Sequence, residues 1–234
     1  MTSGDESAVR ARDAMTPVPS PLRTWRLSWA RRRGDEPYLA LFLPGGEVRS
    51  DAPNHSWQPH ILFVDLLARG CAKRIDGRIA VGTLQWAVQG WNGPRPDPVA
   101  DLAEVLAQVR QAQPGTRVAL IGHSMGGRAA LWGAAQNPVE QLVLLAPWVE
   151  RDDPLPGPST RRIAVAHGLW DRVTPPAASQ RLVERLLSEA QPATYVALPR
   201  VTHYLIDAWR TWRDFACEQL NTWSARPGED RLGR

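Results

Sequence analysis

The stretch with the clearest chemical potential surrounds Ser124, in the run Gly122-His123-Ser124-Met125-Gly126. A serine hydroxyl is a weak nucleophile, so it needs a neighbouring base and a backbone that presents its oxygen to a substrate. Residues 118–122 have the pattern of a buried strand, and the small residues after the serine are typical of a helix. A tight turn between the two requires nearly side-chain-free residues two places before and after the serine. Gly122 and Gly126 occupy these places, which predicts a nucleophile turn; the alternative is a glycine-rich turn without chemistry.

Strand and helix patterns alternate on both sides of this turn. Two strands are expected early in the chain, at 24–30 and 38–43, joined as a hairpin by a charged turn. Further strands are expected at 78–88, 117–122, 141–148, 161–168 and 193–199, and helices at 60–74, 97–115, 125–138, 176–192 and 204–223. The helix at 97–115 begins with Asp97 as a cap and Pro98 in the first helical position. This alternation predicts an α/β fold, with a mostly parallel sheet covered by helices on both faces.

Sites on parallel sheets lie beyond the carboxyl ends of the strands. Four expected strand ends carry unusual residues, at 44–46, 122–127, 167–171 and 202–203. The chemistry is therefore expected where these four segments meet.

The predicted turn around Ser124, which we call the elbow, resembles the α/β-hydrolase family, above all in "LIGHSMGG". The resemblance extends from Trp25 to about Trp223. It implies an α/β-hydrolase fold with an eight-stranded, mostly parallel sheet. It also implies a catalytic serine, acid and histidine that follow one another in this order along the chain.

The same resemblance indicates the acid and the base. "IAVAHGLWDRVTPP" is similar to the family's segment after its seventh strand, which makes Asp171 the acid that orients the histidine. Asp171 would otherwise cap a turn, and Glu150, Asp152 and Asp153 are its rivals. His203, in "LPRVTHYLID", lies where the family carries its catalytic histidine.

The other histidines are His55, His60, His123 and His167. His123 is the variable residue of the elbow and is expected to point into the fold, while His167 lies at a strand end.

An oxyanion hole requires two backbone N–H donors. The resemblance implies Met125 as one of them, and the loop after residues 38–43 as the source of the other. We expect the second donor to be Gly46 or Gly45, because Pro44 has no N–H and departs from the His-Gly pair of many relatives. A glycine turn without this role is the alternative. In "VQGWNG", Gln89 stands in place of an arginine and is interpreted as structural.

Segment 148–162 is too short and too rich in proline and glycine to form the helical cap of many relatives. The site is therefore expected to be open. Trp148, Trp170 and Trp91 are candidates for an apolar substrate pocket, although core packing would explain each equally well.

The composition is that of one globular domain, predicted over residues 24–224, with a disordered leader at 1–23 and a flexible tail at 225–234. No apolar run approaches the length of about 18 residues that a membrane span needs, and no secretory signal is present, which favours a cytoplasmic protein. The net charge is +4, and all but one of the 28 basic residues are arginine. Arg31–Arg33 is interpreted as a solvated turn, so neither a nucleic-acid nor a membrane partner is expected. Cys71 and Cys217 are expected to be buried free thiols.

These features predict a serine hydrolase that cleaves a carboxylic ester or thioester through an acyl-enzyme, with Ser124, His203 and Asp171 as its catalytic residues. The substrate would be a small acyl compound, and no metal or organic cofactor is expected because no ligand cluster or dinucleotide-binding loop is found. Acyl transfer to an alcohol or amine would use the same residues. A binding protein that keeps the fold without turnover is the other alternative.

Overall fold

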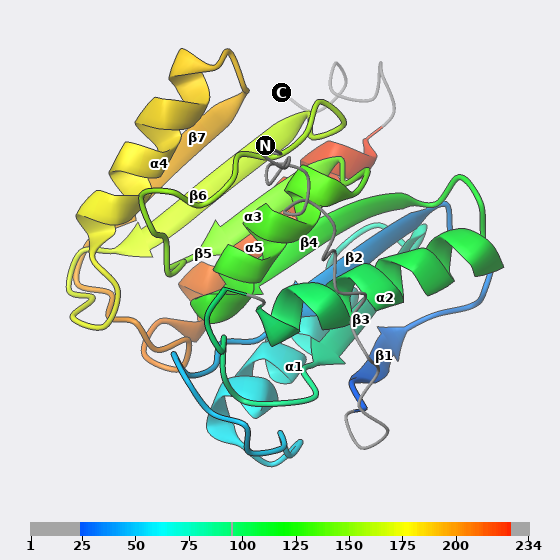
Figure 1. Ribbon diagram of the computed structural model, residues 1–234. Helices are drawn as coiled ribbons and strands as arrows, with labels where there is room; N and C mark the ends of the chain where they lie inside the picture. Colours follow the sequence, from blue (N-terminus) through cyan, green and yellow to red (C-terminus); the bar gives the residue numbers. More distant parts are fainter. Residues whose placement is uncertain (1–23, 95, 226–234) are drawn as a thin grey trace, which may run out of the picture.

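The computed structural model describes residues 24–94 and 96–225. Strands and helices alternate along the chain, as Figure 1 shows. The strands are β1 (Arg26–Arg31), β2 (Tyr38–Leu43), β3 (Ile79–Gln85), β4 (Arg117–His123), β5 (Gln141–Leu145), β6 (Arg162–Gly168) and β7 (Ala193–Leu198). The helices are α1 (Pro59–Ala72), α2 (Asp97–Ala112), α3 (Met125–Gln136), α4 (Pro176–Ser188) and α5 (Trp209–Ser224).

The strands form one sheet in the order β1-β3-β2-β4-β5-β6-β7, in which only β1 runs antiparallel to its neighbour. The predicted α/β fold is thereby confirmed. The described residues contribute seven strands, however, and not the expected eight. The predicted hairpin is also wrong, because β3 lies between β1 and β2. All six residues of β2 are buried, because helices cover both faces of the sheet and β3 and β4 lie on either side of this strand. The partly exposed β1 is an edge strand.

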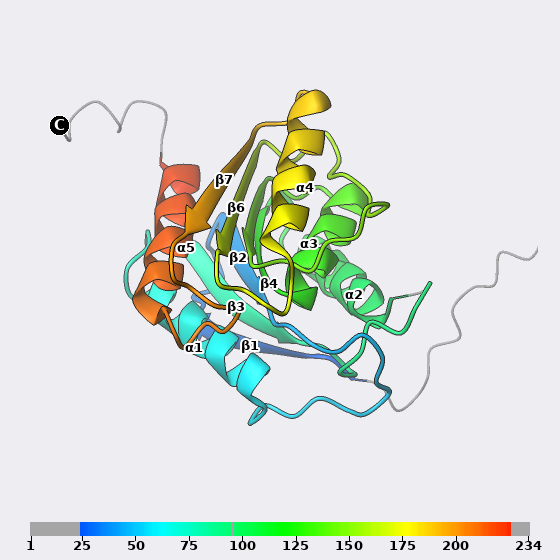
Figure 2. The same ribbon diagram turned by 90° about the vertical axis from the view of Figure 1, so that its left-hand side faces the viewer.

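Helices cover both faces of the sheet (Figure 2). On one face α1 and α5 pack against the strands, and Leu67 and Trp212 lie completely buried in that core. On the other face α2, α3 and α4 contribute Leu102, Leu131 and Leu186 to a second core. Parallel strands buried on both sides fix the strand ends rigidly, which is the property that a site at those ends needs.

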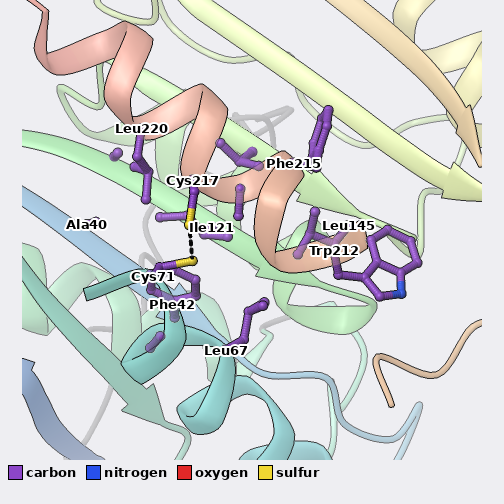
Figure 3. Packing of buried hydrophobic residues seen from close by; sticks show 14 of the residues in the cluster. Ala40, Phe42, Leu67, Cys71, Ile121, Leu145, Trp212, Phe215, Cys217 and Leu220 are labelled. Atoms are coloured by element: carbon purple, nitrogen blue, oxygen red, sulfur yellow. Dashed lines mark hydrogen bonds between the residues drawn. The ribbon is translucent and has the colours of Figure 1, made fainter. Parts of the chain in front are cut away.

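The two cysteines meet in the first of these cores (Figure 3). Cys71 of α1 and Cys217 of α5 are both buried, and their Sγ atoms lie 3.3 Å apart as free thiols. Hydrogen bonding to Cys217 and burial raise the pKa of the Cys71 thiol. Because both side chains are buried among apolar neighbours, they act as small apolar side chains in the packing of α1 on α5.

Several helix boundaries differ from those expected. Pro96 and not Asp97 caps α2, so Asp97 opens the helix and Pro98 follows it. The last helix begins at Trp209 and not at residue 204, because residues 199–208 form the loop that carries His203. Residues 146–161 contain neither helix nor strand, which confirms that no cap domain interrupts the fold there.

Within the described ranges, no helix combines the length and the apolar character needed to cross a bilayer. The predicted leader at 1–23 lies outside the described residues, as does all of the predicted tail except Ala225.

Candidate active site

Ser124 lies on a strained turn between β4 and α3. Its φ of 54° and ψ of −121° are values that residues with a side chain rarely adopt. Hydrogen bonds to the next strand and the loop after it help to hold this backbone: the Ser124 N–H donates to the Leu145 carbonyl at 3.1 Å, and the Ser124 carbonyl accepts from the Trp148 N–H at 3.0 Å. The turn leaves the serine partly exposed, while its neighbours His123 and Met125 are buried.

The two glycines of the turn meet backbone on every side. A Cβ at Gly122 would lie 2.3 Å from the Gly126 carbonyl oxygen, and a Cβ at Gly126 would lie 2.2 Å from the Leu43 carbonyl oxygen. No side chain fits at such distances. The glycine spacing that predicted the turn thus has a steric cause, and Gly126 also lets α3 approach the end of β2.

His203 occupies the loop after β7, which is fixed to the core by the buried side chains of Val201 and Leu205. Its Nε2 lies 3.0 Å from the Ser124 Oγ, and its Nδ1 lies 2.7 Å from the Asp171 Oδ2. The structure therefore brings together the three side chains that the sequence indicated, in one hydrogen-bonded row. Because a carboxylate only accepts, His203 carries its proton on Nδ1 and offers Nε2 as an acceptor to the serine hydroxyl.

Asp171 is buried and receives five hydrogen bonds. The backbone N–H groups of Val173 and Thr174 donate to Oδ1 at 2.7 and 2.9 Å. The Thr174 hydroxyl, His167 and His203 donate to Oδ2. Burial alone would raise the pKa of Asp171, but the bonds from His167, His203 and the Thr174 N–H outweigh it and hold that pKa well below its usual range. Asp171 is therefore an anion at every pH near neutrality.

The loops that carry Asp171 and His203 are joined directly. The Trp170 N–H donates to the Val201 carbonyl at 3.0 Å, and a Cβ at Gly168 would lie 2.3 Å from the same oxygen. The His-Gly pair before the acid thus contains a glycine because the two loops touch at this point. Their distance is set by backbone contacts and not by mobile side chains.

The rival acids have other partners. Asp153 is buried and forms an ion pair with Arg128 at 2.8 Å, and it also accepts a hydrogen bond from the Trp132 indole. Glu150 is exposed and accepts from the Trp148 indole at 2.7 Å, and Asp152 is exposed as well.

His167 extends the hydrogen-bonded row behind Asp171, a contact that sequence reasoning did not find. Its Nε2 lies 3.1 Å from both the Asp171 Oδ2 and the Thr174 carbonyl, so it donates there, and its Nδ1 accepts from the Ser179 hydroxyl at 2.7 Å. His167 and Ser179 are both completely buried. A histidine that ends a buried strand four residues before the acid was the available signal, but its partner Ser179 comes from α4.

His123 points into the fold and packs on His203, with ring centroids 4.9 Å apart. Its Nε2 donates to the His203 carbonyl at 2.9 Å. Burial, reinforced by the neighbouring His203, lowers the pKa of His123 to about 3, so this ring is neutral and supports the loop of the other histidine.

The glycine loop after β2 borders the elbow. A Cβ at Gly45 would lie 3.2 Å from the Ser124 Cβ, and a Cβ at Gly46 would lie 2.3 Å from the Met125 Cε. Throughout the described part of the chain, no protein acceptor is bonded to the N–H groups of Gly45, Gly46 and Met125.

Hydrogen bonds on either side of Gly45 and Gly46 hold the glycine loop in place. The Trp86 indole donates to the Pro44 carbonyl at 2.9 Å, and the Gln89 carbonyl accepts from the Glu47 N–H at 2.8 Å. The Glu47 side chain is exposed. Pro44 and Gln89, the two departures from the family pattern, therefore contribute carbonyl groups to the architecture of this loop.

The three candidate pocket tryptophans have different environments. Trp91 is buried and packs edge-on against Trp132 and Trp148, which favours its core role. Trp148 is half-buried, and the Arg128 guanidinium lies 4.4 Å from its ring centroid. Trp170 is exposed and lines a groove beside His203.

Comparison with known proteins bears on the fold. The family model for serine aminopeptidases of the S33 family matches residues 95–165, and no protein with a curated description matches the sequence. A lidless α/β serine hydrolase from Xanthomonas campestris superposes with a TM-score of 0.66 at 21% identity, covering 88% of this chain and 93% of that one.

Two further structures are similar in fold. An acetyl ester-xyloside bifunctional hydrolase from Caldicellulosiruptor lactoaceticus has a TM-score of 0.60 at 16% identity, and 94% of this chain and 93% of that chain are covered. A thermophilic esterase from Thermogutta terrifontis has a TM-score of 0.59 at 17% identity, with 87% and 92% covered. The chain is an α/β-hydrolase by fold, in a form without a lid.

Proposed function

We propose that this protein is a serine hydrolase that cleaves a carboxylic ester or thioester through an acyl-enzyme. One observation carries the proposal: the Ser124 hydroxyl, the His203 ring and the Asp171 carboxylate form a continuous hydrogen-bonded row at 3.0 and 2.7 Å. The presence of esterases among the structural neighbours supports the preference for an ester. The substrate that we propose is a small acyl compound.

In the first half of the reaction, Ser124 Oγ attacks the carbonyl carbon and passes its proton to His203 Nε2. The imidazolium that forms is stabilised by the Asp171 carboxylate against its Nδ1–H. When the tetrahedral intermediate collapses, Nε2 gives this proton to the leaving oxygen or sulfur, and the alcohol or thiol departs. The acyl group remains on Ser124 as an ester.

In the second half, a water molecule takes the place of the leaving group. His203 Nε2 accepts a proton from this water while its oxygen attacks the acyl carbon, and it then returns the proton to Ser124 Oγ. The carboxylic acid is released and the starting state is restored.

The negative oxygen of each tetrahedral intermediate needs two donors. We assign the Met125 N–H to this role, together with the Gly46 or Gly45 N–H of the neighbouring loop. The position of Met125 at the first turn of α3 supports the assignment, because the positive end of the helix dipole lies there. Losing one such donor typically costs about 3 kcal/mol of barrier.

Labelling with a fluorophosphonate probe tests the assignment of Ser124. The unaltered protein is expected to form one covalent adduct at Ser124 and to hydrolyse short p-nitrophenyl esters, and Ser124→Ala is expected to do neither. Ser56→Ala removes an exposed serine outside the site and serves as the control. Turnover by a folded Ser124→Ala variant at the unaltered rate would refute the proposal.

A further inference from the structure

Large apolar side chains are exposed on the two loops that carry Asp171 and His203. Five such residues lie there, each between 49% and 60% exposed: Leu169, Trp170, Val173, Tyr204 and Ile206. A single exposed apolar residue needs no explanation, but a contiguous group of them marks a binding surface. Their neighbours Val201 and Leu205 are buried in the core, so the loop with His203 presents these groups from a fixed base.

Four of these side chains enclose a groove of about 700 Å³ with His203 in its wall. They are Leu169, Trp170, Val173 and Tyr204, and the last of these rings packs edge-on against the His203 ring at 5.9 Å. The volume lies within the range of sites for small organic molecules. Arg172 and Asp207, of opposite charge, also line the groove, and so does Asp171. The Asp171 carboxylate is buried and its charge is matched by five hydrogen bonds, so the exposed walls are mainly the four apolar side chains. The groove therefore suits an uncharged apolar group.

The position of His203 decides which half of a substrate reaches this groove. In the proposed reaction Nε2 must deliver its proton to the leaving atom, so that atom lies on the His203 side of Ser124. The carbonyl oxygen is directed elsewhere, towards the amides of Met125 and the glycine loop. The bond to the leaving group then points across His203 towards the apolar walls.

We infer that the groove formed by Leu169, Trp170, Val173 and Tyr204 binds the leaving-group half of the substrate, an uncharged aromatic or alkyl alcohol or thiol. This inference rests on the proposed function, which supplies the direction of the leaving group. It deepens that function, because it assigns the specificity of the enzyme for the alcohol half to these four side chains. The acyl half is then held elsewhere.

Two series of esters test this inference. In the first, acetate esters carry alcohols of increasing apolar size; in the second, methyl esters carry acyl groups of the same sizes. A methylene that leaves water completely is worth about fourfold in binding, and one in an open groove about twofold. We expect kcat/KM of the unaltered enzyme to rise about twofold per methylene in the alcohol series.

Trp170→Ala should flatten the alcohol series and leave the acyl series unchanged. For the largest alcohol the expected loss in kcat/KM is about tenfold, and for methyl acetate less than about twofold. Acetate esters share one acyl-enzyme, so within each protein the deacylation rate should be the same for every alcohol. Trp57→Ala truncates an exposed tryptophan outside the groove and is the matched control. Because Trp170 is itself exposed, its truncation removes little packing.

The outcomes separate the inference from the function on which it rests. If Ser124 is labelled and methyl acetate is hydrolysed, but Trp170→Ala leaves the slope of the alcohol series intact, the groove assignment is wrong. A flattened acyl series would equally overturn it, since the groove would then hold the acyl chain. Absence of both labelling and hydrolysis would instead refute the proposed function.

Discussion

Replacing Asp171 by asparagine should reverse the proton arrangement of His203. The Oδ1 atom of Asp171 accepts two backbone N–H groups, from Val173 and Thr174, so the amide oxygen of an asparagine must occupy that position. Its NH₂ group then takes the place of Oδ2, at 2.7 Å from His203 Nδ1. An NH₂ group only donates, which forces the His203 proton onto Nε2. That nitrogen can no longer accept the proton of Ser124.

The magnitude of this effect follows from the chemistry of the row. A serine hydrolase whose histidine is held in the wrong tautomer loses about 10⁴ in kcat. At about 1.4 kcal/mol per factor of ten, this corresponds to about 5.5 kcal/mol of lost transition-state stabilisation. His167 and Thr174 also lose an acceptor, so some loss of folding stability accompanies the loss of activity.

The assay is hydrolysis of p-nitrophenyl acetate, measured as kcat for Asp171→Asn beside thermal unfolding of the same preparation. Asp152→Asn makes the identical change at an exposed position and should retain full activity. If a folded Asp171→Asn variant keeps more than a tenth of the original kcat, the tautomer argument is wrong. Loss of activity in Asp152→Asn would show that the acid has been misassigned.

Two further predictions concern the framework of the site. Gly126→Ala should lower the free energy of unfolding by about 2 kcal/mol or more, because its Cβ would lie 2.2 Å from the Leu43 oxygen. Gly77→Ala, where a Cβ meets nothing within 4 Å, should leave the midpoint of urea unfolding unchanged, and equal effects of the two would contradict the steric argument. The pKa of His123 falls from 6.5 to about 3 on folding, so below pH 6.5 the unfolded chain binds the extra proton. The free energy of unfolding should then decrease as the pH falls from 6.5 towards 3, by up to about 1.4 kcal/mol per pH unit. In His123→Gln, urea titrations across this range should show a shallower dependence, and an unchanged slope would exclude His123 as its source.

Much of the site follows from short-range rules that a sequence displays. Gly122 is required by the turn itself, because a Cβ there would meet the Gly126 carbonyl four residues away. Gly126 was indicated by the same spacing, although the group that a Cβ would meet there is the Leu43 carbonyl of β2. Asp171 and His203 each follow a strand of a parallel sheet, so both were expected at the edge where Ser124 lies. The continuously apolar residues of β2 likewise indicated a strand.

Other features depend on contacts between distant segments. β3 inserts between β1 and β2, although a hairpin of these two was the local expectation. His167 meets Ser179 of α4 and shares the Asp171 carboxylate with His203, and nothing in the pattern around position 167 specifies these partners. Trp91 and Trp170 have the same side chain, yet one is buried against Trp132 and Trp148 and the other is exposed beside His203.

Features that the sequence indicated and features that only the tertiary structure decided differ in the range of the forces behind them. Backbone sterics and hydrophobic periodicity act over a few residues, so the sequence by itself indicated the strands, the helices and the turn at Ser124. The acid and the histidine, and their order after the serine, came from the resemblance to the α/β-hydrolase family. Strand order, shared hydrogen bonds and the exposure of each tryptophan depend on the packing of segments far apart in the chain. The distances between Ser124, His203 and Asp171, and the shape of the groove beside them, are therefore set only when folding brings these segments together.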